Sequence, residues 1–220
     1  MSDPVPTLPS EAQPPPLATD LWLIRHAEVE PKYQRVFGGT IDMEISSFGR
    51  EQAITLARYL EGKQFSAVYA SPMRRVQQTL APFLGNALPC PRIIPEFREV
   101  DFGGWTGLSW DEVRVRFGIS AFSWLDQLDC GGIPNCETVS MLRRRVEPPL
   151  RSILSEHAGD RIAIFCHGGV IRIMLSLLLE VPAPQLASFE IEYTSITQVS
   201  CEPGRTRLEL LNFTPWRDLD

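Results

Sequence analysis

The chain has 220 residues, a formal net charge of −6 at pH 7, 44% hydrophobic and 22% charged residues. At roughly 100–200 residues per domain, this length corresponds to one domain, which can bury a core without a disulfide or a metal. The acidic balance argues against a general nucleic-acid or anionic-membrane binder. Lys32 and Lys63 are the only lysines, and every other basic residue is arginine. Because arginine forms a planar fork that suits carboxylates and phosphates, the positions of the arginines matter more than their number.

The five cysteines, at positions 90, 130, 136, 166 and 201, form no disulfide or metal-binding pattern. Free thiols in a reducing cytoplasm are therefore expected, and no metal site. The N-terminus lacks the basic and apolar segments of a signal peptide, and the longest apolar stretch, residues 170–179, is too short to cross a bilayer. We expect a cytoplasmic protein without a membrane or nucleic-acid partner.

Residues 1–20 differ from the rest of the chain. Six of them are proline, three in a row at positions 14–16. This composition is typical of a disordered or polyproline-like tail, so we expect the folded domain to occupy residues 21–220.

In the folded part, short apolar runs alternate with helical patterns. The expected strands cover residues 21–24, 67–70, 92–94, 161–166, 189–193, 195–201 and 206–212. The expected helices cover about 46–61, 71 onward, 137–157 and 168–179, with aromatic-rich helical pieces between 109 and 129. Residues 31–45 read as a loop, and Ser71 and Pro72 fit the cap and first position of the second helix.

This alternation of strands and helices predicts an α/β fold. We expect a three-layer α/β/α sandwich with a mostly parallel central sheet, and a small lid insertion at about 100–135. In such sheets the ligand site lies beyond the carboxyl ends of the strands.

Two of the three histidines directly follow apolar strands. His26 and His167 each stand at a strand end and precede small residues. One such histidine is more often a buried, hydrogen-bonded side chain, but two in the same context favour a shared site. His157 lies near a helix end, where it can complement the helix dipole, and we assign it no catalytic role.

Two arginines occupy comparable places. Arg25 directly precedes the first of these histidines, and Arg74 follows another strand at the start of a helix. A cation is unfavourable for the dipole there, so Arg74 is either a solvated or ion-paired side chain or points into a pocket that holds an anion. We expect Arg75 on the surface. Together with the histidines and the glycines at 38–39 and 168–169, the two arginines can form a cage for phosphate.

Glu99 is the candidate general acid. An acidic residue in a loop is usually a solvated charge, but the flanking Phe97, Val100 and Phe102 favour partial burial. Burial raises the pKa of a carboxyl group and suits proton donation.

Further on, three tryptophans and two phenylalanines between 105 and 124 predict a small second core under a lid, an apolar wall of the substrate pocket, or both.

Five segments resemble, in order, the signatures of the histidine phosphatase superfamily, also called phosphoglycerate mutase-like. They are RHA at 25–27 (RHG in the family), GTID at 39–42 with FGREQA at 48–53 (G-x-x-D and G-x-x-Q-A), VYASPMRRVQQT at 68–79 (VYSS-x-x-x-R-x-x-Q-T), REVDFGGWTG at 98–107 (RE-x-x-FG-x-WEG) and IFCHGGVIR at 164–172 (V-x-HGG-x-x-R). The resemblance covers about residues 21–213.

The resemblance implies a role for each matching residue. His26 would be the nucleophile and become a phosphohistidine. Arg25, Arg74 and His167 would hold the phosphoryl oxygens, and Glu99 would protonate the leaving oxygen and then activate water. A neutral imidazole is a competent nucleophile near neutral pH, and phosphoryl transfer depends mainly on positioning and charge neutralisation. No metal or other cofactor is required.

Several positions depart from the family pattern. Ala27 replaces the glycine of RHG, and Cys136-Glu137-Thr138 replaces the family's G-E-S before the long helix. Lys32 stands where many members carry an asparagine that contacts phosphate, and could supply a cation instead. We expect Lys32, Gly39 and Gly168 to contact the substrate.

The run after Glu99 reads V-D-F-G and resembles the phosphatases of the family, whereas the glycolytic mutases carry R-H-Y-G. We therefore expect a metal-independent phosphomonoester hydrolase, a histidine acid-type phosphatase of a small phosphorylated metabolite. A cofactor-dependent phosphoglycerate mutase and a non-catalytic phosphate-binding module are the alternatives. The sequence does not choose the natural substrate, and it leaves a homodimer open.

Overall fold

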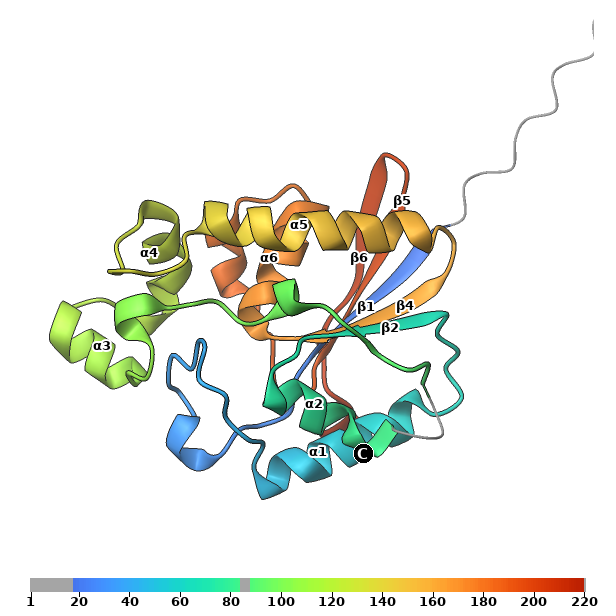
Figure 1. Cartoon of the computed structure of the whole chain (residues 1–220), viewed down its shortest axis with the longest axis horizontal. Coiled ribbons are helices and arrows are strands. Elements are labelled where there is room, and N and C mark those ends of the chain that lie inside the picture. The colour runs from blue at the N-terminus through green and yellow to red at the C-terminus, as the bar shows by residue number, and fades with distance from the viewer. Residues whose placement is uncertain (1–17, 84–87, 220) are drawn as a thin grey trace, which may run out of the picture.

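A computed structural model of the chain describes residues 18–83 and 88–219 (Figure 1). The strands are β1 (Thr19–Arg25), β2 (Ala67–Ala70), β3 (Arg92–Ile93), β4 (Arg161–Cys166), β5 (Ile196–Glu202) and β6 (Arg205–Phe213). The α-helices are α1 (Ser47–Leu60), α2 (Arg74–Leu80), α3 (Trp110–Phe117), α4 (Trp124–Cys130), α5 (Val139–Glu156), α6 (Gly168–Leu178) and α7 (Pro215–Asp218). The tail expected over residues 1–20 lies outside the described residues up to position 17, and Thr19 and Asp20 already belong to β1.

The strands form one sheet in the order β3-β2-β4-β1-β5-β6. The first four in this order pair in parallel, and β5 and β6 are antiparallel, which confirms the mostly parallel sheet. The last residues of neighbouring strands lie side by side: Arg25 pairs with Cys166, and Ala70 pairs with Phe165. The residues that follow β1, β2 and β4 therefore meet at one edge of the sheet.

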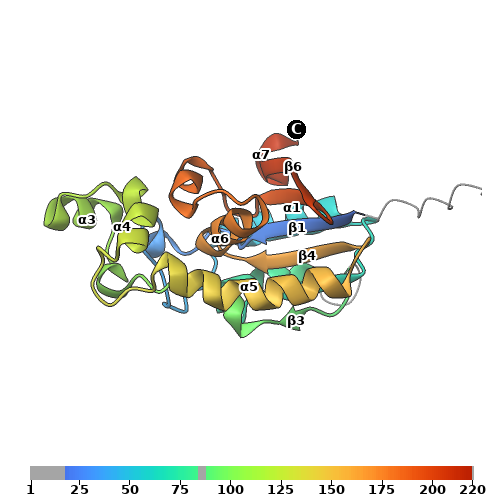
Figure 2. The same cartoon turned by 90° about the horizontal axis from the view of Figure 1, so that it is seen from above.

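Helices cover both faces of this sheet, as expected for three layers (Figures 1 and 2). Side chains alternate along β1, so that Leu21 and Leu23 pack against the layer of α5 and α6, whereas Trp22 and Ile24 pack against the layer of α1 and α2. Parallel strands buried on both faces read as continuous apolar runs, which is why these strands were visible in the sequence.

The segment between β3 and α5 forms the expected insertion beyond one end of the sheet, at the left of Figures 1 and 2. It contains α3, α4 and the short 3-10 turns Gly103–Trp105 and Ala121–Ser123. Trp105, Leu125 and Leu128 are fully buried and extend the core on the α5 face of the sheet into this insertion. The described residues include no helix that is both long and apolar enough to cross a membrane.

Three expected boundaries are wrong. Helix α2 begins at Arg74, with Met73 rather than Ser71 at the cap position, and the Ser71 hydroxyl pairs with His167 Nε2 at 2.8 Å. Helix α5 begins after Thr138, whose hydroxyl accepts from the Met141 amide. Residues 189–193 form no strand, since arginine side chains take their backbone carbonyls, as described below.

Candidate active site

The polar residues that follow β1, β2 and β4 meet in a pocket of about 430 Å³ at the edge of the sheet nearest the insertion. The inner part of the pocket is lined by charged side chains and glycine backbone, and the outer part by aromatic side chains of the insertion. The inner lining includes Arg25, His26, Arg75, Glu99, Gly168 and Arg172.

His26 follows β1 and is almost fully buried, with 4% of its surface exposed. Its Nδ1 lies 2.8 Å from the carbonyl oxygen of Ala27. Because a carbonyl can only accept, Nδ1 carries the proton and Nε2 keeps its lone pair. Burial, together with the charges of Arg75 and Arg25, lowers the pKa of His26 well below 6.5. His26 is therefore a neutral imidazole whose Nε2 carries no proton at neutral pH.

His167 follows β4 and lies beside His26, with the two ring centres 5.2 Å apart. The Nε of Arg75 donates to both rings, at 3.2 Å from His26 Nε2 and 3.2 Å from His167 Nδ1. His167 Nε2 therefore carries the proton and donates to the hydroxyl of Ser71. Burial and the charge of Arg75 lower the pKa of His167 as well. The guanidinium of Arg75 thus donates to two neutral imidazoles.

The arginine from α2 at the site is Arg75, which corrects the expectation of Arg74. Arg75 is 2% exposed, and its two terminal nitrogens donate to the carbonyls of Ile41 and Gly39 at 2.9 and 3.3 Å. Burial lowers the pKa of Arg75 to about 10, so it stays charged at neutral pH. The side chain of Arg74 is 52% exposed and pairs with Glu44 at 2.8 Å. Arg74 therefore belongs to the surface.

Helix geometry explains why Arg75 rather than Arg74 reaches the pocket. Successive helical side chains point roughly 100° apart, and the buried face of α2 begins at Arg75, so Arg74 turns outward. Val76 and Thr79 share the buried face with Arg75. The family spacing R-x-x-Q-T also falls on Arg75 when it is counted back from Thr79, and this signal could have found the residue.

Arg25 is held against the pocket wall from the loop that follows α6. Its Nη1 donates to the carbonyl of Ile191 at 2.6 Å, and its guanidinium lies over the Tyr193 ring, 4.1 Å from the centre. Its Nε is buried and donates to none of the described residues. A buried donor without an acceptor is costly, so it favours an anion in the pocket.

A third arginine at the pocket is Arg172 of α6, for which we expected no role from the sequence. It donates to the carbonyls of Phe189 and Gly168 at 2.6 and 3.1 Å, and burial lowers its pKa to about 10. Its place as the last residue of the HGG-x-x-R segment was the available signal.

Glu99 reaches the pocket from the loop between the 3-10 turns Pro95–Phe97 and Gly103–Trp105. Its Oε1 accepts from the Val100 amide at 3.0 Å, and its Oε2 accepts from the Gly169 amide at 3.4 Å. A Cβ at position 169 would lie 2.6 Å from Glu99 Oε1, so glycine is needed for this approach. The half-buried carboxyl group lies at the N-terminus of α6, on the same pocket as His26.

Of the three residues expected to contact the substrate, two line the pocket and one does not. Gly39 lines the pocket and adopts a positive φ of 49°, which glycine tolerates best, and Gly168 lines the pocket as the first residue of α6. The structure does not bring Lys32 there. Its side chain is 64% exposed and pairs with Glu30 at 3.5 Å, so that expectation is corrected.

The aromatic residues of the insertion serve both expected purposes. Trp105 is 1% exposed and belongs to the core, whereas Trp110, Phe122 and Trp124 line the outer pocket. The rings of Trp110 and Phe122 meet edge to face with centres 5.5 Å apart, and Phe122 is 70% exposed.

The inner pocket is suited to a phosphate group. Three guanidinium groups and the N-terminus of α6 line the same pocket as His26, and both features attract anions. In the part of the chain that the structure describes, no group of three or more His, Cys, Asp or Glu residues could hold a metal ion.

Comparisons with known proteins agree with this geometry. The sequence model of the histidine phosphatase superfamily (branch 1) matches residues 21–214. The chain is 27% identical to phosphoserine phosphatase 1 of Hydrogenobacter thermophilus, over 88% of this chain and 92% of that protein. It is 30% identical to the 2,3-bisphosphoglycerate-dependent phosphoglycerate mutase of Methylorubrum populi, over 78% and 84%. The crystal structure of the alpha-ribazole phosphatase from Shigella flexneri superimposes with a TM-score of 0.74 at 26% identity, covering 89% of this chain and 96% of that one.

Proposed function

Because this chain belongs to the histidine phosphatase superfamily (branch 1), we propose that it hydrolyses phosphomonoesters through a phosphohistidine on His26, as a histidine acid-type phosphatase. The observation that carries the proposal is the state of His26. Its Nδ1 proton is held by a carbonyl, its Nε2 is unprotonated, and Arg75, whose Nε donates to Nε2 at 3.2 Å, is placed to neutralise an incoming phosphoryl group.

The first step transfers the phosphoryl group to the enzyme. The lone pair of His26 Nε2 forms the bond to phosphorus, and the bond from phosphorus to the ester oxygen breaks with its electron pair on that oxygen. Protonated Glu99 gives its proton to this oxygen, and the alcohol leaves. Arg25, Arg75 and Arg172 lie where they can neutralise the equatorial oxygens, which is the main contribution a protein makes to phosphoryl transfer.

The second step returns the enzyme to its starting state. The Glu99 carboxylate takes a proton from water while the water oxygen forms a bond to phosphorus. The bond between phosphorus and Nε2 breaks, its electron pair returns to His26, and inorganic phosphate leaves. The charges come from side chains of the chain itself, so the proposed reaction requires no metal.

The outer pocket supports hydrolysis of a small metabolite rather than the mutase alternative. Its charged residues are Arg35, Glu190 and Glu192, and the rest of its wall is largely apolar. A mutase must hold a phosphoglycerate carboxylate in two orientations, and a single cation beside two carboxylates is poorly suited to that task.

Phosphate release from a panel of phosphomonoesters, with EDTA present, tests the proposal. The panel contains 3-phosphoglycerate, phosphoserine, phosphosugars, α-ribazole phosphate and p-nitrophenyl phosphate. We expect release by the wild type and none above background by His26→Ala. A matched control is His157→Gln, since His157 lies outside the pocket and pairs with Asp160. Equal release by wild type and His26→Ala would overturn the proposal. Interconversion of phosphoglycerates without release would establish the mutase.

The acid role of Glu99 has its own test. Nitrophenolate leaves without a proton, so Glu99→Gln should lower kcat/KM, which reports the first step, much less for p-nitrophenyl phosphate than for an alkyl phosphate. Equal losses on both substrates would remove Glu99 from the acid role and leave the nucleophilic role of His26 standing.

A further inference from the structure

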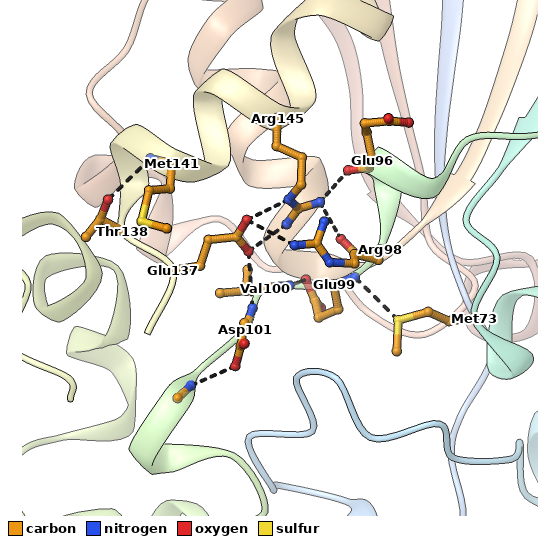
Figure 3. A network of polar contacts seen from close by, with 11 residues as sticks. Met73, Glu96, Arg98, Glu99, Val100, Asp101, Glu137, Thr138, Met141 and Arg145 are labelled. Carbon is orange, nitrogen blue, oxygen red and sulfur yellow. Dashed lines mark hydrogen bonds and ion pairs between the residues drawn. The ribbon is translucent and has the colours of Figure 1, made fainter. Parts of the chain in front are cut away.

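We propose that Glu137 and Arg145 are positioning residues that hold the backbone on both sides of Glu99 and thereby aim its carboxyl group at the leaving oxygen (Figure 3). The inference rests on the proposed function, in which Glu99 is the general acid. Neither residue lines the pocket.

The two side chains form a nearly buried ion pair. Arg145 projects from α5, and Glu137 stands just before the residue that caps this helix. Nε of Arg145 lies 2.6 Å from Oε1 of Glu137, and Nη2 lies 2.8 Å from Oε2. The side chains are only 10% and 7% exposed. Such a two-pronged contact fixes geometry as well as charge, and a buried pair is better explained by that positioning than by stability alone.

The contacts of this pair fall on both sides of Glu99, as Figure 3 shows. On one side, Nη1 of Arg145 donates to the carbonyls of Glu96 and Arg98, the latter at 2.9 Å. On the other side, the amide of Asp101 donates to Oε2 of Glu137 at 3.3 Å, and the Glu137 amide donates to the Asp101 carbonyl at 2.8 Å.

Glu99 itself has weaker contacts. Beyond the bond to its neighbour Val100, its carboxyl group has the Gly169 amide at 3.4 Å, and its amide has the sulfur of Met73 at 3.4 Å. The position of its side chain therefore depends on where the flanking backbone is held. Because α5 packs on α6, which begins at Gly168, the ion pair ties Glu99 to the helical layer that carries the other side of the pocket.

Two other roles are open to Arg145 and predict different kinetics. A purely structural role would lower the amount of folded enzyme and slow every substrate alike. A role through His167, whose pKa the charge of Arg145 also helps to lower, would likewise act on both substrates, since both need the phosphate site. Only a displaced proton donor makes the loss depend on the leaving group.

The test compares Arg145→Lys and Glu137→Gln with Arg143→Lys. Arg143 lies on the same helix and ties it to α6 through the Ser176 hydroxyl at 3.0 Å, without touching the Glu99 segment. The lysine keeps the charge of Arg145 but loses its fork, and the glutamine keeps an acceptor for the Asp101 amide. Rates are expressed per folded molecule from near-ultraviolet circular dichroism, so partial unfolding does not imitate the effect.

For Arg145→Lys and Glu137→Gln we expect kcat/KM to fall about 10- to 100-fold on an alkyl phosphate and less than about 3-fold on p-nitrophenyl phosphate, because kcat/KM reports the first step, in which only the alkyl leaving group needs the proton. Arg143→Lys should stay within about 2-fold of wild type on both substrates, because its contact with Ser176 involves neither the pocket nor the Glu99 segment. Added to Glu99→Gln, Arg145→Lys should cost less than about a further 2-fold, because residues that act through one group are not additive.

Equal losses on both substrates, or full additivity with Glu99→Gln, would overturn the positioning role. Failure of this inference is distinguishable from failure of the proposed function. If His26→Ala abolishes activity and Glu99→Gln shows the leaving-group effect, but Arg145→Lys and Glu137→Gln do not, the hydrolase stands and the positioning role falls.

Discussion

Replacing Arg75 with alanine should abolish most of the activity, whereas the same change at its neighbour Arg74 should have little effect. In Arg75→Ala, both imidazoles lose the Nε donor at 3.2 Å, and the carbonyls of Ile41 and Gly39 lose theirs. The phosphoryl group loses a buried cation at the same time. Removal of one preorganised donor typically costs about 10²- to 10³-fold in rate. Since Arg75 supplies both charge and alignment, we expect about a 10³-fold fall in kcat/KM, or about 4 kcal/mol.

Arg74→Ala is the matched control, because it removes a guanidinium from the adjacent position of the same helix. Its partners Glu44 and Asp42 are exposed, and exposed ion pairs contribute about 1 kcal/mol or less. We expect kcat/KM within about 2-fold of wild type, as typical of a surface change. Initial rates over a range of p-nitrophenyl phosphate concentrations measure both variants, and thermal unfolding confirms that each is folded.

The reverse outcome would refute this reasoning. If Arg74→Ala lost the activity and Arg75→Ala kept it, the arginine from α2 that binds phosphate would be the one favoured by the sequence, and the helix register would be wrong. Arg75→Lys adds a further check. It keeps the charge without the fork, so it should recover part of the loss but not all of it.

The remaining predictions concern the acid, the histidines and the outer pocket. Gly169→Ala should slow alkyl phosphates more than p-nitrophenyl phosphate, because its Cβ would lie 2.6 Å from Glu99 Oε1; Gly104→Ala, where a Cβ would lie 3.4 Å from its nearest neighbour, should not. A histidine kept neutral in the folded state makes unfolding easier as pH falls below 6.5, since only the unfolded chain then takes up the proton. Denaturant titrations should therefore show the free energy of unfolding decreasing as pH falls below 6.5, with a shallower dependence on pH in His26→Asn than in wild type. Phe122→Ser should raise KM for 2-phenylethyl phosphate about 2- to 10-fold and leave KM for ethyl phosphate unchanged, since one aromatic contact is worth about 0.5–1.5 kcal/mol; equal changes in the two KM values would exclude Phe122 from the substrate wall.

The sheet and two histidines of the site could be predicted from local patterns. A strand buried on both faces appears in the sequence as a short apolar run, and the residue after it lies at the carboxyl end of the strand. His26 and His167 follow such runs directly, so their meeting follows from the parallel pairing of β1 with β4. The cap of α1 likewise depends only on neighbouring residues, since the Ser46 hydroxyl accepts from the Gly49 amide three residues later.

The errors arise where a side chain's direction depends on distant partners. The choice between Arg74 and Arg75 depends on the residue at which α2 begins. That helix begins three residues after Ser71, whose hydroxyl pairs with His167 Nε2 from a distant part of the chain. Residues 189–193 alternate apolar and acidic side chains as a strand does, but the carbonyls of Phe189 and Ile191 accept from Arg172 and Arg25. No periodicity in the sequence announces such contacts.

The most direct measurement of the central claim is capture of the phosphorylated enzyme. A radiolabelled phosphomonoester is mixed with the protein, the reaction is quenched within one turnover, and the labelled peptide is identified. Label is expected on the peptide that contains His26, stable in alkali and lost in acid, with none in His26→Ala and more in a variant such as Glu99→Gln that slows release by water. Turnover without a labelled intermediate, or label on a residue other than His26, would contradict that claim.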